Sequence, residues 1–188
     1  MRPRRWLVAL VAVGATVSLG IGAAADEALP GRPKIHFAEE VPDDLRALAS
    51  STWDRFLQGL PARSGCLVDV TLRGAWRFGT RAAYDPGRHL VTVRIPGTAP
   101  NLRATMVHEF AHHLEFTCPA QRRLRPRFLA AQGLPPTTSW RRGQAWAQIP
   151  SEQFAEAMVR VVLGAQPGGL VVIRPEALRA IRDWGRGG

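Results

Sequence analysis

Residues 105–114 read TMVHEFAHHL and contain an HExxH motif formed by His108, Glu109 and His112. Asn101 stands where a helix would begin, because its side chain can cap free backbone N–H groups. From there onward apolar residues recur at helical spacing: Leu102, Met106, Phe110 and Leu114. The pattern predicts an amphipathic helix on which two histidines, four residues apart, project one turn above each other.

Two histidines in this arrangement can bring their imidazoles to one metal ion, with Glu109 beside them. Zinc suits the set because it accepts imidazole nitrogen, keeps an open position for water and lowers the pKa of that water toward about 7. Glu109 can then act as the general base and pass the proton to a leaving amine. We therefore expect one Zn²⁺ ion bound by His108 and His112. The alternative is a solvated helix face that carries two histidines.

A zinc site of this type needs a third protein ligand. Residues 151–157 read SEQFAEA, in which Glu152 and Glu156 are four residues apart. The combination of HEFAH with EQFAEA resembles the catalytic domain of the anthrax lethal factor family, which consists of gluzincin-type zinc metallopeptidases. The resemblance implies a zincin-like fold, Glu152 as the third zinc ligand and Glu156 as the acid that orients a histidine from behind. Alternatively, both glutamates lie on a solvated face, where Glu156 pairs with Arg160.

The resemblance leaves the oxyanion stabiliser open. No tyrosine lies shortly before Glu152, and Trp146 stands where a hydroxyl would help. Tyr84 is the sole tyrosine, and His113 is turned about 100° from His112 around the helix. We consider Tyr84 and His113 as candidate oxyanion stabilisers, with a surface position or a place behind the ligands as the alternative for His113.

The rest of the chain predicts an α+β fold, with a small, mainly antiparallel sheet packed on the HExxH helix and a helical second half. Alternating apolar and polar residues predict strands at residues 66–73, around Trp76 and Phe78, and at residues 90–95. Asp85, Pro86 and Gly87 predict a turn before the last of these strands. Helical spacing predicts helices at residues 43–59, from Asn101, and at residues 119–132, 151–163 and 175–184.

The N-terminal segment has the order of a secretory signal. Three arginines precede an apolar run over residues 6–22, and three alanines follow it at residues 23–25. This predicts a signal peptide over residues 1–25 and a single domain over residues 26–188, with an uncleaved membrane anchor as the alternative. In an oxidising exterior the only two cysteines, Cys66 and Cys118, are expected to form a disulfide rather than remain two buried thiols.

The chain is strongly basic, with 25 lysines and arginines, 15 acidic residues and a formal net charge of +10. Two groups of arginines stand out in the second half: Arg122, Arg123, Arg125, Arg127, Arg141 and Arg142. Such clusters can bind acidic substrates or anionic envelope polymers, although a solvated face is the default. Nucleic acid is not an expected partner, because an export signal is present and no recognition motif is visible.

Together these features predict a zinc metallopeptidase that is secreted or held at the exterior of the cell envelope. Its partner would be a peptide or protein substrate, which the resemblance to zincins implies would add to the strand at residues 90–95. The alternative is a zinc-binding pseudo-peptidase that acts as an envelope binding module without turnover. The missing oxyanion tyrosine motivates this alternative.

Overall fold

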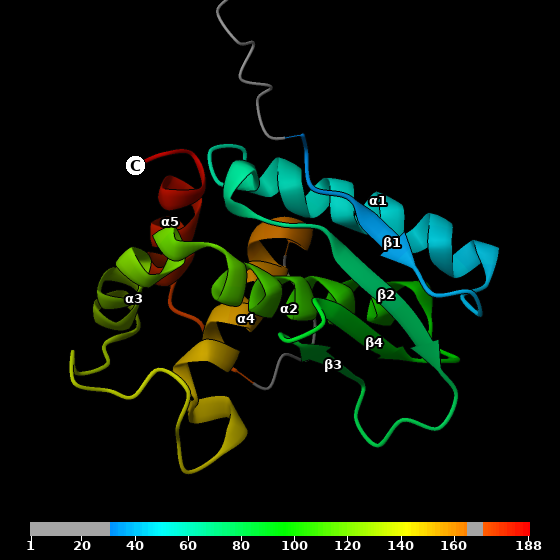
Figure 1. The fold of residues 1–188 in the computed structure, drawn as a ribbon. Helices are drawn as coiled ribbons and strands as arrows, with labels where there is room; N and C mark the ends of the chain where they lie inside the picture. Colours follow the sequence, from blue (N-terminus) through cyan, green and yellow to red (C-terminus); the bar gives the residue numbers. More distant parts are fainter. Residues whose placement is uncertain (1–30, 165–170) are drawn as a thin grey trace, which may run out of the picture.

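The computed structural model describes residues 31–164 and 171–188, so the predicted signal peptide lies outside the described residues. Within them the chain forms five α-helices and one four-stranded sheet, which confirms the predicted α+β class (Figure 1). None of the described helices combines the length and the apolar character needed to cross a bilayer.

The elements follow one another in an order that places the strands early and most helices late. They are β1 (Ile35–Phe37), α1 (Asp43–Gly59), the 3₁₀ turn η1 (Ser64–Cys66), β2 (Val70–Ala75), β3 (Ala82–Asp85), β4 (Leu90–Arg94), α2 (Ala99–Thr117), α3 (Pro119–Gln132), the 3₁₀ turn η2 (Trp146–Gln148), α4 (Pro150–Leu163) and α5 (Pro175–Gly185). The last four α-helices each carry a proline in the first turn. A proline there removes an N–H that has no helical partner, and its fixed φ suits the helix.

The sheet is mixed, and the prediction of a mainly antiparallel sheet is wrong. Its strand order is β1-β2-β4-β3, in which β1 and β4 both run parallel to β2, and only β3 and β4 are antiparallel. Helix α1 carries the chain back between β1 and β2, and such a crossover returns the next strand in the same direction. Strand β4 then inserts between β2 and β3. An alternating pattern reports a half-buried strand but not the direction of its neighbour.

Two strand boundaries also differ from the prediction. The region around Trp76 and Phe78 belongs to the loop between β2 and β3, and Trp76 is 72% exposed there. Strand β3 lies just beyond it, and a turn from Asp85 leads into β4. At the other end, Cys66 belongs to η1, and β2 begins only at Val70. Aromatic residues are common in strands, which is why the sequence predicts one here, but the backbone of this segment pairs with no strand of the sheet.

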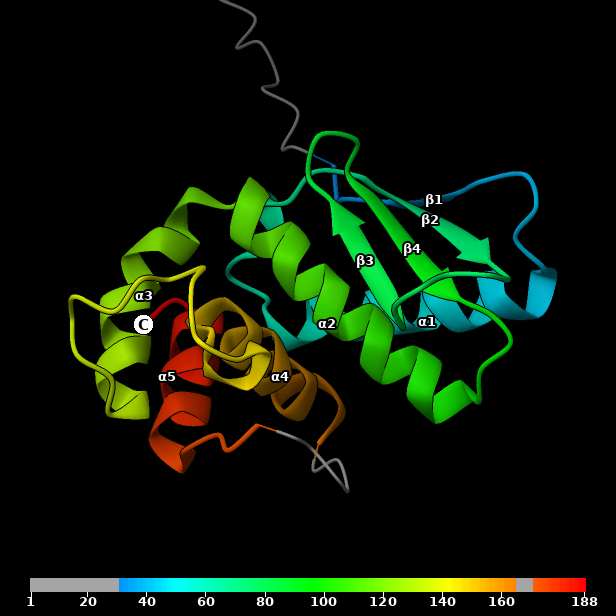
Figure 2. The ribbon, with the colours of Figure 1, turned by 90° about the horizontal axis from the view of Figure 1, so that it is seen from below.

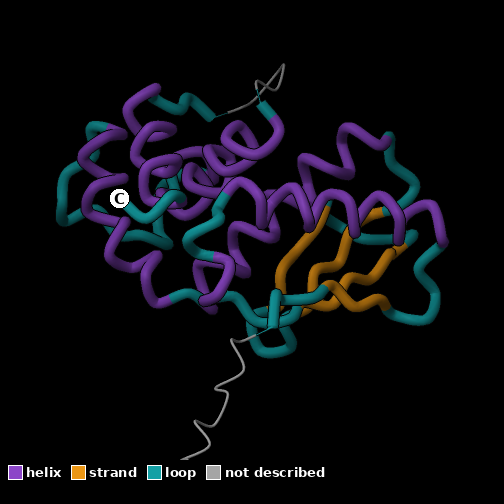
Figure 3. Tube along the Cα trace, turned by 90° about the horizontal axis from the view of Figure 1, so that it is seen from above, coloured by secondary structure: helices purple, strands orange, loops and turns teal. Residues whose placement is uncertain are grey.

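Helix α2 runs through the middle of the molecule. Figure 2 shows the sheet on one side of it and α3, α4 and α5 on the other, and in Figure 3 the strands gather at one end of the trace. Phe110 of α2 is fully buried and meets Trp53 and Phe56 of α1, with ring centroids 4.9 and 5.7 Å away. Beyond α2, Phe154 of α4 packs against Phe128 of α3 at 5.7 Å. The HExxH helix is therefore held between two halves of one core.

The predicted disulfide between Cys66 and Cys118 is confirmed. It links η1 to the residue that ends α2, across a separation of 52 residues. Closing a loop of this length removes entropy from the unfolded chain, and it fixes the exit of α2 into α3.

Candidate metal centre

His108 and His112 lie on the side of α2 that faces α4, with imidazole centroids 4.9 Å apart. The Nε2 atoms of the two rings are 3.2 Å apart. Oε2 of Glu152, in the first turn of α4, lies 3.1 Å from Nε2 of His108 and 3.5 Å from Nε2 of His112. The three predicted ligands are thus close enough to hold a metal ion.

This triangle of atoms fits a small tetrahedral cation. Ligand atoms about 2.0–2.2 Å from a tetrahedral zinc lie about 3.3–3.6 Å from one another. The three measured separations, from 3.1 to 3.5 Å, lie at or slightly below this range. The three side chains are between 12% and 18% exposed, so an ion among them would remain open to the cleft.

Glu156 lies one turn after Glu152 and contacts His108 from behind. Its Oε1 atom accepts a hydrogen bond of 3.0 Å from Nδ1 of His108. A proton held at Nδ1 leaves the Nε2 lone pair of this ring directed at the ligand triangle. This is the position that the resemblance implied for Glu156.

His112 has a buried carboxylate behind it that the sequence did not single out. Glu115 has a fully enclosed side chain, and its Oε2 atom lies 3.6 Å from Nδ1 of His112. Its Oε1 atom accepts a 2.7 Å hydrogen bond from Arg141, and Arg125 lies 3.6 Å away. Burial opposes the charged form of Glu115, but His112 and Arg141 outweigh it and lower the pKa of this carboxyl. The available signal was an acid three residues after a ligand histidine, at a helix position that faces the same side.

The charges of the cluster are strongly coupled. Burial opposes protonation of His112, yet its carboxylate neighbours Glu115 and Glu152 outweigh burial and raise the pKa of His112 to about 10. The pKa of His108 is raised in the same way by Glu152 and Glu156. Burial likewise opposes the charged form of Glu152, but the two histidines lower the pKa of this carboxyl. Positive charge at the centre is therefore favoured, and a bound cation would replace protons there.

Glu109 differs from the other acids of the site. It is buried but lines the same cleft as the three candidate ligands, and it makes no hydrogen bond to any described residue. Burial raises the pKa of its carboxyl, and the nearby histidines only partly oppose the shift. A free carboxylate of raised pKa has the properties of a general base.

The structure does not bring His113 to the candidate ligands. Its ring is fully buried, and Nε2 donates a 3.0 Å hydrogen bond to the carbonyl of Val68, because a carbonyl only accepts. Nδ1 therefore accepts from the hydroxyl of Tyr84 at 2.9 Å. Burial lowers the pKa of His113 to about 4, so the ring is neutral. Both ring nitrogens are engaged, and neither is free to stabilise an oxyanion.

Tyr84 lines the cleft, but its hydroxyl is tied to two histidines. Besides donating to His113, its oxygen lies 3.2 Å from Nδ1 of His89, which donates to it. Burial raises the pKa of Tyr84, so the hydroxyl stays protonated. In this arrangement the hydroxyl proton of Tyr84 is directed at Nδ1 of His113.

A cleft of about 1200 Å³ contains the candidate ligands and Glu109. Strand β3 contributes to its lining, as does Trp146, whose ring stacks at 5.9 Å from the ring of His108. The expectation that a peptide adds to residues 90–95 is wrong, because β4 is paired on both sides. The edge strands of the sheet are β1 and β3, and of these two β3 lines the cleft.

Two of the six arginines noted in the sequence serve the interior. Arg141 bonds to Glu115 and lies over the ring of Phe116, 4.0 Å from its centroid. Arg125 donates to Gln121 and lies over the ring of Trp140. These two guanidinium groups offset the charge of the buried carboxylate of Glu115. They therefore do not belong to a wholly solvated face, which is the default expectation.

Comparisons with protein families, with curated proteins and with solved structures gave no match for this chain. What the cleft does must therefore be inferred from its own side chains. These are two imidazoles, one carboxylate that completes a ligand triangle, and one carboxylate that no described residue engages.

Proposed function

We propose that this protein is an exported zinc metallopeptidase of the gluzincin type, which hydrolyses peptide bonds in the cleft along α2. One observation carries the proposal. The ligand atoms of His108, His112 and Glu152 lie 3.1 to 3.5 Å apart, close to the spacing that tetrahedral zinc requires, and the free carboxylate of Glu109 lines the same cleft. The predicted signal peptide at residues 1–25 and the disulfide support a location in an oxidising exterior.

Each acid of the site has a distinct part in this proposal. When bound, zinc supplies a Lewis acid that polarises a carbonyl oxygen and makes water a better nucleophile near neutral pH. Glu109 accepts the proton of the attacking water and delivers it to the nitrogen of the leaving amine. Glu156 and Glu115 act at the Nδ1 side of His108 and His112 and keep the Nε2 atoms turned toward the triangle.

The edge of β3 provides a place for an extended peptide. Arg94 donates its backbone N–H to the carbonyl of Arg81, so these two residues form a hydrogen-bonded pair. Hydrogen-bonded pairs alternate with non-hydrogen-bonded pairs along an antiparallel ladder. The backbone N–H and C=O groups of Ala82 and Tyr84 therefore point away from β4. The carbonyl of Ala82 accepts a hydrogen bond from the hydroxyl of Thr80, which agrees with this orientation. A substrate strand can pair with these backbone groups, and such main-chain hydrogen bonds would bind it independently of its side chains.

A second function has an observation in its favour. Neither candidate oxyanion stabiliser has a free donor, because both nitrogens of His113 and the hydroxyl of Tyr84 are hydrogen-bonded to each other or to neighbours. A zinc-binding pseudo-peptidase without turnover needs no such donor. It would act as a binding module at the envelope through the same cleft.

Cleavage of a peptide library by purified residues 26–188, read by mass spectrometry, separates the two functions. The peptidase should cleave, lose activity on chelation and regain it with one equivalent of zinc. Glu109→Gln should retain zinc but lose turnover, because the change removes a proton acceptor and no ligand. Zinc binding without cleavage would favour the pseudo-peptidase, and failure to bind zinc would overturn both functions.

A further inference from the structure

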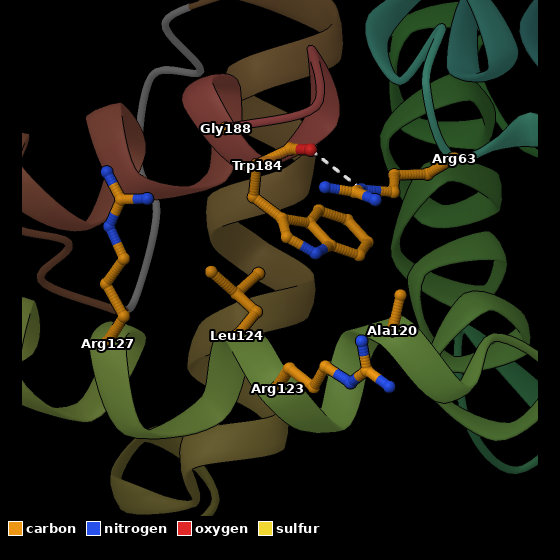
Figure 4. A pocket seen from close by; sticks show the side chains of 7 residues that line it. All are labelled: Arg63, Ala120, Arg123, Leu124, Arg127, Trp184 and Gly188. Carbon is orange, nitrogen blue, oxygen red and sulfur yellow. Dashed lines mark hydrogen bonds between the residues drawn. The ribbon is translucent and has the colours of Figure 1, made fainter.

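A second, smaller cavity lies between α3 and α5 and shares no lining residue with the cleft (Figure 4). Its volume is about 230 Å³. Three arginines, Arg63, Arg123 and Arg127, line it together with the ring of Trp184, and no acidic side chain belongs to its lining. The apolar side chains of Ala120 and Leu124 and the polar main chain of Gly188, the last residue of the structure, complete the wall.

Arg63 is held in place by one end of its guanidinium group. Its Nε donates a 2.8 Å hydrogen bond to the carbonyl of Trp184, and its Cζ lies 5.0 Å from the centroid of the indole ring. Neither terminal nitrogen of Arg63 bonds to a described residue, and no described carboxylate lies within ion-pair distance. The fixed guanidinium therefore presents unengaged donors at a set position, which is what an anion site requires.

Two further donors face the same space. Trp184 is only 5% exposed, yet its indole N–H makes no hydrogen bond to any described residue. Figure 4 shows the indole nitrogen turned toward the space between Leu124 and Arg123. Arg123 has no carboxylate partner among the described residues, whereas Arg127 is paired with Asp183 at 3.0 Å. The indole nitrogen is open to the cavity, and a hydrogen-bond acceptor there would satisfy its N–H.

The walls of the cavity are tied to each other covalently. Arg63 lies three residues before Cys66, and Ala120 lies two residues after Cys118, so the disulfide joins the segments that carry the two walls. On the side of Cys66, its Sγ also contacts the carbonyl oxygen of Arg63 at 3.0 Å. Arg63 and the ring of Trp184 therefore belong to a preorganised frame, to which the exposed side chain of Arg123 adds a further donor.

We propose that this cavity binds a phosphate group, held by Arg63, Arg123 and the indole N–H of Trp184. Donors that approach from different elements suit a tetrahedral oxyanion, which presents oxygens on several sides, better than a planar carboxylate. A water takes up about 30 Å³, so the cavity has room for one phosphate group with a few waters. The group belongs either to free phosphate or to the headgroup of an anionic lipid. This site does not depend on the peptidase proposal.

Titration of the protein with inorganic phosphate, followed by NMR of ¹⁵N-labelled tryptophan side chains, tests the site. Ionic strength is kept constant with sodium chloride, so that only specific binding shifts the resonances. The indole resonance of Trp184 should move and saturate. Any phosphate that reaches the metal centre would be seen separately at Trp146, which stacks near His108.

Two neighbouring arginines of α3 provide a matched pair of variants. Arg123→Gln should weaken the response of Trp184 about 10-fold or more, because it removes a charged donor from the site. Arg122→Gln removes the same charge from an exposed position outside the cavity and should leave the affinity unchanged. A Trp184 resonance that does not respond, or a loss that is equal in the two variants, overturns the proposal.

Vesicles identify the source of the phosphate group. Binding to phosphatidylglycerol vesicles that exceeds binding to phosphatidylcholine vesicles, and that falls with Arg123→Gln but not with Arg122→Gln, assigns the site to a lipid headgroup. A response to inorganic phosphate without such vesicle binding assigns it to the free ion. Both results support a phosphate site.

Discussion

Glu152 and Glu156 lie one turn apart on α4, yet they contact opposite nitrogens of the same ring. Glu152 meets Nε2 of His108, where a metal would bind, whereas Glu156 meets Nδ1. Only the first contact adds an atom to the ligand triangle. The second holds the ring in one orientation and keeps its proton at Nδ1, so the two glutamates should differ in what their loss does to metal binding.

Replacing each glutamate by alanine under the same metal-buffered conditions tests this difference. Glu152→Ala should strip the zinc, because two histidines alone leave the ion without its third protein ligand. Glu156→Ala should weaken zinc affinity only about 10- to 100-fold, since His108 still coordinates but is less well oriented. Metal content after dialysis is the measurement. Unchanged zinc in both variants would remove α4 from the metal centre.

His113 makes the stability of the fold depend on pH. Burial lowers its folded pKa to about 4, whereas an unfolded histidine titrates near 6.5, so between these values only the unfolded chain takes up the proton. Stability from this residue is complete above about pH 6.5 and falls as the pH drops toward 4. The loss between pH 7 and pH 5 should be about 2 kcal/mol.

Urea unfolding of the wild type and of His113→Gln at pH 7 and pH 5, with chelator present, measures this contribution. Glutamine can still donate to the carbonyl of Val68 and accept from Tyr84, but it does not titrate. The variant should therefore lose less stability than the wild type between the two pH values. Equal losses would contradict the assigned neutral state of His113.

At the scale of elements, the proposed pairing of a peptide substrate depends on the free edge of β3. Ala82→Pro removes a backbone N–H that points away from β4, so the ladder within the sheet stays intact. The variant should raise KM for extended peptides about 3- to 10-fold, with kcat less affected, because one hydrogen bond to the substrate is lost. Ala82→Ser keeps the N–H and serves as the control. An unchanged KM would show that peptides do not pair with this edge.

Helices were more predictable than the sheet because their signals are local. The helical spacing of apolar residues, together with prolines at the first turn, predicts α3, α4 and α5 closely. The direction of β4 depends instead on β2, with Leu72 opposite Val91, and no pattern within either strand encodes that pairing. The sequence therefore predicts that these residues form strands but leaves their order and direction open.

The candidate site likewise contains residues that local sequence motifs predict and residues that they do not. His108, His112 and Glu152 lie in short motifs whose spacing alone places them on one helix face each. The environment of His113 comes from Val68 and Tyr84, which are 45 and 29 residues away in sequence. Glu115 likewise depends on Arg141, 26 residues later. Contacts of this range are set by the packing of the whole molecule, so the sequence pattern could not assign these two residues.

At the scale of the molecule, the candidate metal centre lies between α2, which packs on α1 and the sheet, and α4, which packs with α5. An ion bound by His108, His112 and Glu152 would therefore join two layers of the core, and binding to the folded chain alone stabilises it by mass action. Free zinc at about 1,000 times its dissociation constant should add about 4 kcal/mol to the free energy of unfolding.

Thermal unfolding with zinc and with chelator measures this coupling in the wild type and two variants. Glu109→Gln should keep the full rise in melting temperature, because its carboxylate is not one of the triangle atoms. Glu152→Ala should lose the rise, because the link from α2 to α4 is broken. A rise that survives in Glu152→Ala would mean that zinc binds elsewhere. A rise that disappears in Glu109→Gln would place Glu109 among the ligands and leave the proposed reaction without its general base.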